Sequence, residues 1–102
     1  MSDDEKVMAP THPGVILREE FLEPMGITEY QLAKAIGVPQ TRISAITHGN
    51  RRITADTGLR LSRYLGMSEA FWTGMQEDYD REIAKDHLGA TLDNIHPIAV
   101  AS

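Results

Sequence analysis

The stretch from Thr28 to Asn50, TEYQLAKAIGVPQTRISAITHGN, constrains the fold more than any other part of the chain. Thr28, with Gln31 three residues later, matches the capping box that opens a helix. Gly37 is suited to the left-handed conformation that ends a helix. Pro39 is suited to the first turn of a new helix, because no backbone N–H is needed there. The stretch therefore predicts two short helices joined by a turn of roughly three or four residues.

The apolar side chains of this stretch give each predicted helix one buried face. Leu32, Ala33 and Ile36 lie at helical spacing in the first helix. Ile43 and Ile46 do the same in the second, and the small Ala33 lets the two helices cross closely. Two helices joined by a short turn that contains glycine are the signature of a helix-turn-helix. Spacing alone also fits an ordinary helical hairpin within a bundle.

The polar side chains of the second helix face away from its two isoleucines. They are short hydrogen-bonding groups and one arginine, which suit the reading of base edges in the major groove. A recognition helix enters the groove with its N-terminal end first. Each residue taken singly also fits a solvated surface position. As a set, we expect the following residues to bind DNA: Gln40, Thr41, Arg42, Ser44 and Thr47.

Two adjacent arginines, Arg51 and Arg52, follow the second helix directly. Arginines in a loop just beyond a recognition helix are well placed for phosphates, which position a protein on the duplex without reading its sequence. The alternative is a solvated loop. Lys34 in the first helix and Asn50 at the end of the second complete the set of expected DNA-binding residues.

Charge is unevenly distributed along the chain, although its net value is −5. Residues 33–66 hold six basic residues and a single acidic one, Asp56, so the remainder of the chain is strongly acidic. A basic middle in an acidic chain predicts a positive patch on one face, which suits nucleic acid. Segregation of this size also arises by chance in short chains.

Three segments together resemble a known family. The segment LAKAIGVPQTRISAITHGNRRIT resembles the Xre-type, lambda-repressor-like helix-turn-helix. With HPGVILREEFLEPMGIT before it and ITADTGLRLSRYLGMSEAFWTGMQEDYD after it, the chain is similar to antitoxins of the HigA/VapI group. The resemblance covers Thr11 to Asp80. Its HPG opening and its S-x-x-F-W-x-x-x-Q ending are more specific than the central motif.

The resemblance implies an all-α, five-helix DNA-binding domain that forms a homodimer on double-stranded operator DNA. It also implies an antitoxin that represses its own toxin–antitoxin operon and neutralises a cognate toxin protein, which in that family is usually a RelE-type mRNA endoribonuclease. Many relatives carry Gln where this chain has Glu29. An acid there suits the helix dipole but repels a phosphate, so the phosphate contact of that position is not carried over.

Outside the motif we expect an acidic N-terminal arm over residues 1–10, a helical domain over residues 11–88 and a C-terminal tail over residues 89–102. The tail keeps apolar residues, and either packs on its own dimer or docks on the toxin. The first helix should begin near Thr11 or His12 and stop before Pro24. Thr54 and Ser68 should cap the two helices that follow the motif.

The predicted core consists of apolar residues at helical spacing: Leu17, Phe21, Leu32, Ala33, Ile36, Val38, Ile43, Ile46, Leu61, Leu65 and Phe71. A further apolar band contains Trp72, Met75 and Tyr79. Aromatic residues and methionine are enriched at interface centres, so we assign these three to a dimer interface. Burial within one chain is the alternative.

Nothing in the chain points to catalysis, a metal or a cofactor. There are no cysteines, and none of the four histidines lies three or four residues from another, so no helical metal pair exists. Phosphate-binding loops, nucleophile elbows and HExxH are absent from the sequence. No apolar run reaches the ~18 residues of a membrane span, and the acidic N-terminus lacks a signal core, so we expect a cytoplasmic protein.

Two other interpretations remain open at this point. The first is a helical interaction module whose helix-turn-helix does not bind DNA, which the negative net charge and Glu29 favour. The second is a phage-type repressor without a toxin partner, from which the chain is separated only by its family resemblance.

Overall fold

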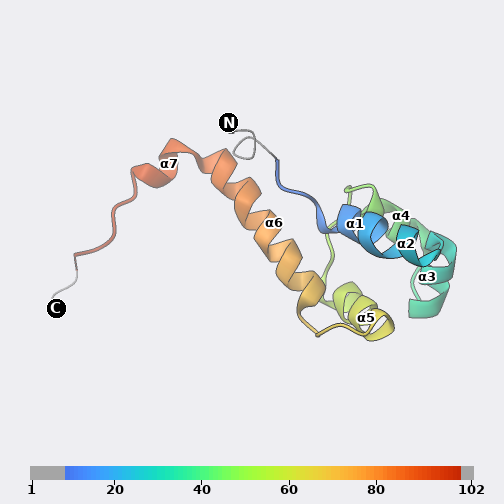
Figure 1. Ribbon diagram of the computed structural model, residues 1–102. Helices are drawn as coiled ribbons and strands as arrows, with labels where there is room; N and C mark the ends of the chain where they lie inside the picture. The colour runs from blue at the N-terminus through green and yellow to red at the C-terminus, as the bar shows by residue number, and fades with distance from the viewer. Residues whose placement is uncertain (1–8, 100–102) are drawn as a thin grey trace.

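The protein is all-helical over residues 9–99, the part that this computed structural model describes (Figure 1). The predicted all-α fold is confirmed. Most of the expected acidic arm, residues 1–8, lies outside the described residues, as do residues 100–102 of the tail. The elements are α1 (Pro13–Ile16), η2 (Leu17–Leu22), α2 (Glu23–Met25), α3 (Glu29–Ile36), α4 (Gln40–Thr47), α5 (Ala55–Leu65), α6 (Phe71–Leu88) and α7 (Ala90–Asp93).

The first three elements form one continuous helix. His12 caps it as predicted: its Nδ1 accepts a hydrogen bond from the Gly14 backbone N–H at 2.8 Å. Pro13 occupies the first helical position, where its missing N–H costs nothing.

The expectation that this helix stops before Pro24 is wrong, because it continues to Met25 and ends at the left-handed Gly26. The six residues of η2 before Pro24 form a π-helix, in which hydrogen bonds run five residues back. The backbone N–H of Glu23 accordingly donates to the carbonyl of Arg18. Proline disrupts the bond to the residue four positions back. The wider turn already omits that bond, so the helix passes the proline.

The central stretch forms the two predicted helices. The Thr28 hydroxyl accepts from the Gln31 backbone N–H at 3.0 Å, and the Gln31 side chain accepts from the Thr28 N–H at 2.9 Å, which completes the capping box. Gly37 ends α3 with a φ of 74°, the left-handed conformation that glycine adopts most readily. α4 follows Pro39 directly, so the connection is as short as a helix-turn-helix requires.

The two helices after the motif do not begin with the predicted capping hydrogen bonds. Thr54 lies at the N-cap of α5, but its side chain makes no capping hydrogen bond. Ser68 is not the cap of α6, because that helix begins at Phe71 after an additional turn. Only its backbone carbonyl takes part, as the acceptor for the Phe71 N–H at 3.1 Å.

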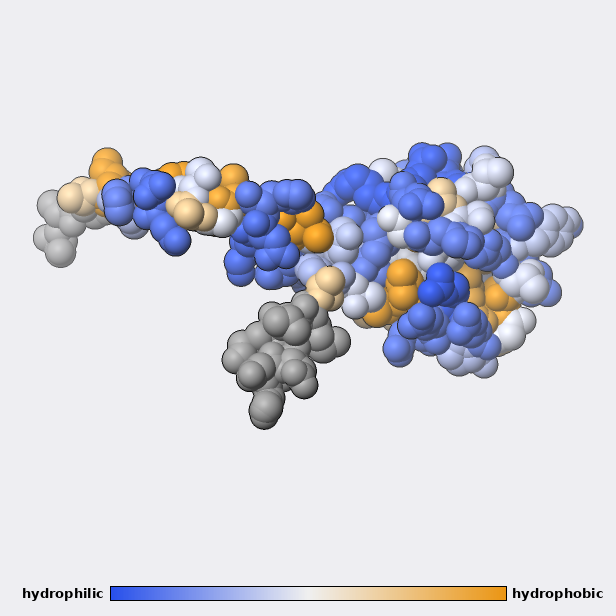
Figure 2. All heavy atoms as spheres, turned by 90° about the horizontal axis from the view of Figure 1, so that it is seen from above, coloured by the Kyte–Doolittle hydropathy of each residue, from blue (hydrophilic) through white to orange (hydrophobic). Residues whose placement is uncertain are grey.

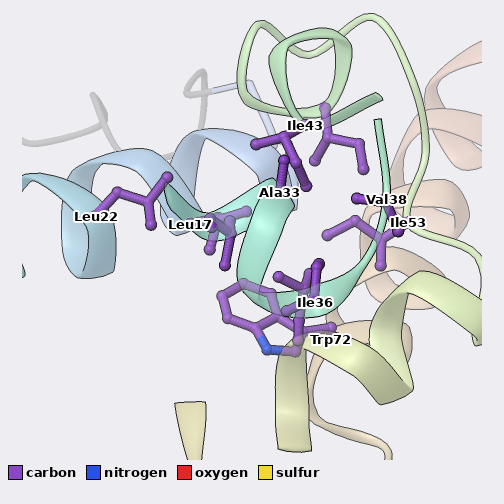
Figure 3. Close-up of a cluster of buried hydrophobic side chains, with 11 residues drawn as sticks. Leu17, Leu22, Ala33, Ile36, Val38, Ile43, Ile53 and Trp72 are labelled. Carbon is purple, nitrogen blue, oxygen red and sulfur yellow. The ribbon is translucent and has the colours of Figure 1, made fainter. Parts of the chain in front are cut away.

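One apolar core joins the motif to the helices on either side of it (Figure 3). Eight of the eleven predicted core residues are buried, while Phe21, Leu65 and Phe71 pack against the core partly exposed. Three buried residues were not in the predicted set, and Trp72 is the largest of them. The buried apolar residues are Leu17, Leu22, Leu32, Ala33, Ile36, Val38, Ile43, Ile46, Ile53, Leu61 and Trp72.

The long helix α6 gives the molecule its elongated shape. Its first turns lie beside α5, its middle turns contact the start of the first helix and the loop after α4, and its last turns lead away from the other helices and carry α7 at the far end (Figure 1). Every residue from Ala84 to Ile98 for which the structure gives exposure is exposed. Within the described residues, no helix combines the length and the apolar character that crossing a membrane requires.

Candidate nucleic-acid interface

The first two turns of α4 present the predicted base-reading side chains. Gln40 and Thr41 are exposed, and Arg42 and Ser44 are half-buried. Ile43 and Ile46 are fully buried on the opposite side, so the predicted facing of these four polar residues is reproduced. Their chemistry, one amide, two hydroxyls and one guanidinium, suits base edges and the phosphates beside them.

Thr47 does not share this exposed face, so its predicted orientation is wrong. Its side chain is fully buried. The hydroxyl donates to Oε2 of Glu29 at 2.6 Å, and it also lies 3.1 Å from the backbone carbonyl of Ser44. Glu29 therefore has a partner inside the protein, and this pair fastens the start of α3 to the end of α4. The acid that departs from the family pattern is explained by this contact.

Two further contacts hold α4 in place. Nη1 of Arg18 donates to the backbone carbonyl of Thr47 at 2.9 Å and thereby satisfies one of the carbonyls left free at the end of the helix. Gly14 in α1 lies so close to α4 that a Cβ atom built on it would collide with the backbone carbonyl of Ile46. The HPG segment is thus a close crossing point between the first helix and the motif.

The loop after α4 is fastened to α6. Arg52 forms an ion pair with Asp80, and Nε2 of Gln76 donates to the other carboxylate oxygen of Asp80 at 3.0 Å. Oε1 of the same Gln76 accepts from the backbone N–H of Ile53 at 2.8 Å. Arg51 lies beside this network and is exposed.

The contacts between the first helix, the loop after α4 and α6 shift the pKa values of His12 and Asp80. Partial burial favours the neutral form of Asp80, but the hydrogen bonds from Arg52 and Gln76 outweigh it and hold the pKa of Asp80 below its usual range. Burial lowers the pKa of His12, against the opposing attraction of Asp80. Neutral His12 is the form that accepts the hydrogen bond capping the first helix. Asp80 stays charged at neutral pH and keeps Arg52 engaged.

The basic residues divide into paired and unpaired groups. Within residues 9–99, five form ion pairs with carboxylates: Arg18, Arg52, Arg60, Arg81 and Lys85. Four others in the same part of the chain form none: Lys34, Arg42, Arg51 and Arg63. Three of these four belong to the predicted DNA-binding set. Positive charge that no carboxylate neutralises is what an electrostatic contact with phosphates requires.

The residues assigned to a dimer interface lie against their own chain. Trp72 is fully buried and packs edge-to-face against Phe21 and Phe71, with ring centroids 5.2 and 5.0 Å apart. Met75 packs partly buried on the core, and the Tyr79 ring lies edge-on to His12 at 5.1 Å. The assignment is wrong for Trp72, for which the alternative of burial within one chain holds.

Two pairings in this site were missed from the sequence, although Thr47 and Arg52 were both in the predicted DNA-binding set. Glu29 and Thr47 are 18 positions apart, and Arg52 and Asp80 are 28 apart. Local spacing carries no signal for pairs at such separations. The described residues contain no cluster of three or more side chains suited to a metal ion.

Comparison with known proteins decides the family. A family model described as helix-turn-helix matches residues 18–72, more than half of the chain. Virulence-associated protein I of Dichelobacter nodosus is 50% identical over 78 residues, which cover 76% of this chain and 72% of the relative. This chain belongs to the HigA/VapI group of the Xre-type helix-turn-helix family.

Two further members of the HigA/VapI group support this placement. Antitoxin HigA-1 of Vibrio cholerae is 39% identical over 71 residues, 70% of this chain and 67% of the relative. The structure of Pseudomonas aeruginosa antitoxin HigA with the higBA promoter matches with a TM-score of 0.83 and 36% identity, over 88% of this chain and 99% of that one. The group consists of helix-turn-helix regulators rather than enzymes, so the expectation of a non-enzyme is confirmed.

Proposed function

We propose that this HigA-like antitoxin is a cytoplasmic homodimer that binds the operator of its own toxin–antitoxin operon, represses it, and neutralises a RelE-type endoribonuclease toxin. The observation that carries the DNA-binding step is the coincidence of unpaired positive charge with the exposed polar start of α4. The promoter in the structure of the P. aeruginosa relative supports the same step.

The residues divide into two roles under this proposal. Gln40, Thr41, Arg42 and Ser44 face base edges, because they lie at the N-terminal part of the helix that enters the groove. Arg51, Asn50 and Lys34 bind phosphates and fix the register of the protein on the duplex. Arg52 joins them only when it leaves Asp80. Thr47 takes no part through its side chain.

A mobility-shift titration tests the proposal directly. The protein is mixed with the DNA upstream of its own gene, and separately with a scrambled fragment, at two salt concentrations. We expect a tight and salt-sensitive shift on the native fragment only. Equal and weak binding to both fragments would leave the helical interaction module as the better description. The toxin step is tested by asking whether the protein blocks RNA cleavage by the product of the neighbouring gene.

The proposed base-reading residues should determine how strongly the protein prefers its native operator over operators with single-base changes. Gln40→Ala and Arg42→Ala are each expected to reduce the preference for the native operator over single-base variants by ~1–3 kcal/mol per lost base contact. Fluorescence anisotropy on a panel of operator variants measures this preference. Thr47→Ser, which keeps the hydroxyl bound to Glu29, serves as the control and should leave the preference unchanged. Equal losses on every operator variant would reassign Gln40 and Arg42 to phosphate contacts.

Unlike Gln40 and Arg42, Arg51 should affect the affinity for all DNA sequences equally, because the phosphates are the same in every sequence. Arg51→Ala is expected to weaken binding to all fragments alike, and to reduce the slope of log affinity against log salt by about 0.9 per subunit for each lost phosphate contact. Arg81→Ala, at an arginine that pairs with acids on the surface of α6, is the matched control and should leave the slope unchanged. A change of base preference in Arg51→Ala would contradict the assigned role.

Asp80 should restrain DNA binding by competing with phosphates for Arg52. Asp80→Asn removes the charge but keeps an oxygen that can accept from Gln76, so we expect tighter binding to native and scrambled DNA alike and a steeper salt dependence. Asp78→Asn, on the same helix and paired with Arg81, is the control. Weaker binding in Asp80→Asn would mean that the ion pair orients Arg52 toward the phosphate instead of withholding it.

A further inference from the structure

The HPG opening and the F-W-x-x-x-Q ending, the two most specific segments of the sequence, meet at the loop after α4. We call residues 49–53 the arginine loop, because they include Arg51 and Arg52 of the proposed DNA interface. The opening contributes His12 to this meeting point, and the ending contributes Gln76. Neither side chain has a part in the proposed contacts with DNA, so their place beside the loop has a different explanation.

The arginine loop is held at both of its ends by these two side chains. At its start, a Cβ atom built on Gly49 would lie 3.8 Å from Cβ and from Cγ of His12, so this side chain lies directly against the loop. At its end, Oε1 of the buried Gln76 accepts from the backbone N–H of Ile53 at 2.8 Å. Both arginines lie between these two fixed points.

The ring of His12 contacts three parts of the protein at once. Nδ1 accepts from the Gly14 N–H at 2.8 Å, and the ring lies edge-on to Tyr79 of α6, with the centroids 5.1 Å apart. Burial lowers the pKa of His12 and outweighs the charge of Asp80 and a hydrogen bond to the backbone of Arg51, both of which favour the protonated ring. Since Nδ1 is an acceptor, Nε2 is the only donor of this neutral ring.

Only the neutral form of His12 fits these contacts. A neutral imidazole has one acceptor and one donor, whereas an imidazolium has two donors. Protonation would place two donors against each other at Nδ1 and the Gly14 N–H. The protonated ring therefore has to leave its position, and the start of the arginine loop loses its support.

The surroundings of the ring leave it open to titration. His12 is half-buried, and hydrophilic side chains predominate where α6 leaves the helical body (Figure 2). The elements packed against the ring carry Asp80 and Tyr79 in α6 and both arginines in the loop, while His48 at the end of α4 is hydrogen-bonded to a carbonyl within that helix. Asp80 is the one charged side chain that favours protonation of the ring, and it is already paired with Arg52.

We propose that neutral His12 is a positioning residue for DNA binding, which holds the arginine loop in place so that the exposed Arg51 meets a phosphate. A flexible loop loses conformational entropy when it binds, and a loop that is already held avoids that loss. The inference rests on the proposed binding of DNA and adds a residue that acts through the loop without touching the duplex. Because Gln76 still holds the other end, loss of His12 should weaken binding without abolishing it.

His12→Asn separates support of the loop from capping of the first helix. Asparagine is among the best N-cap residues and can accept from the Gly14 N–H, but it has no ring to lie against Gly49 and Tyr79. We expect a folded variant by circular dichroism that binds native and scrambled DNA roughly tenfold more weakly, the worth of one charge-assisted hydrogen bond. His87→Asn, at an exposed histidine near the end of α6, is the matched control and should bind as the parent does.

The pH profile is the readout that loss of a helix cap alone would not change. Anisotropy titrations compare the parent, His12→Asn and His87→Asn at pH values above and below 6.5, the ordinary pKa of histidine. We expect the advantage of the parent over His12→Asn to shrink as the pH falls, because the protonated ring no longer supports the loop. An advantage that grows instead would show that the ring contacts DNA as a positive charge, and would overturn the inference.

The remaining outcomes distinguish this inference from the proposed function. Equal affinities of the parent and His12→Asn above pH 6.5 would overturn the role of His12 and leave DNA binding intact. A parent that does not bind its own upstream DNA would overturn both. If His12→Asn fails to fold, NMR of the parent decides: the amide signals of residues 49–53 should shift with the same midpoint as the His12 ring, and signals that do not follow the ring would overturn the inference.

Discussion

Gly14→Ala is expected to destabilise the protein by more than about 3 kcal/mol, at or beyond the upper end of the usual cost of overpacking. The added Cβ would overlap the backbone carbonyl of Ile46 in α4, and a backbone atom cannot move aside as the end of a flexible side chain does. The first helix and α4 must therefore separate, and the contacts that hold the recognition helix are lost with them. Urea denaturation measures the stability loss, and DNA binding should weaken on every sequence.

Gly74→Ala is the matched control for this substitution. Gly74 lies within α6, and a Cβ added there meets no other atom within 4 Å. Alanine in a helix interior is more favourable than glycine by roughly 0.5–1 kcal/mol, so this variant should be slightly more stable than the parent. If Gly14→Ala instead stayed within half a kcal/mol of the parent, α1 and α4 would not cross as closely as described.

Trp72→Ala should cost about 3–5 kcal/mol, the range for removing a large buried aromatic side chain. Trp72 is fully buried and contacts both Phe21 and Phe71, so its removal leaves a cavity between the first helix and α6. Denaturant unfolding followed by circular dichroism gives this free energy, since the substitution removes the only tryptophan.

Trp72→Phe separates the role of the ring from that of its N–H group. The indole Nε1 is buried without a hydrogen-bond partner in the described part of the protein, so phenylalanine gives up no hydrogen bond there. We expect this variant to lose much less stability than Trp72→Ala. A free energy of unfolding for Trp72→Ala close to that of the parent, together with a shift from dimer to monomer, would restore Trp72 to an interface between chains.

Local signals in the sequence predicted the motif accurately. The Thr28–Gln31 capping box and the Gly37 helix end depend on residues within a few positions of each other, and both are present. The side of α4 that holds Ile43 and Ile46 follows from helical periodicity alone. The exposed polar start of α4 could therefore be predicted before the structure.

The features that were predicted wrongly depend on tertiary contacts, which the spacing of residues along the sequence does not reveal. Thr47 has the same hydroxyl chemistry as Ser44, which stays half-buried on the polar side of α4, but the hydrogen bond to Glu29 places the Thr47 side chain inside the protein. Trp72 fits a dimer interface equally well in composition, and only the positions of Phe21 and Phe71 place it in the core. The helix that passes Pro24 is a further case, because the π-helical turn that permits it has no local sequence signal.

The contacts that hold α4 against the first helix and α3 have a consequence for how the proposed toxin, once bound, would affect transcription. Arg18 secures the end of this helix, Glu29 its last side chain, and Gly14 its distance from the first helix. With three anchors, α4 keeps its position relative to the rest of its own chain, so in the proposed homodimer only the distance between the two recognition helices can change. A toxin bound to both chains of that proposed dimer would then change repression by changing this distance, while the base-reading surface of each helix stays the same.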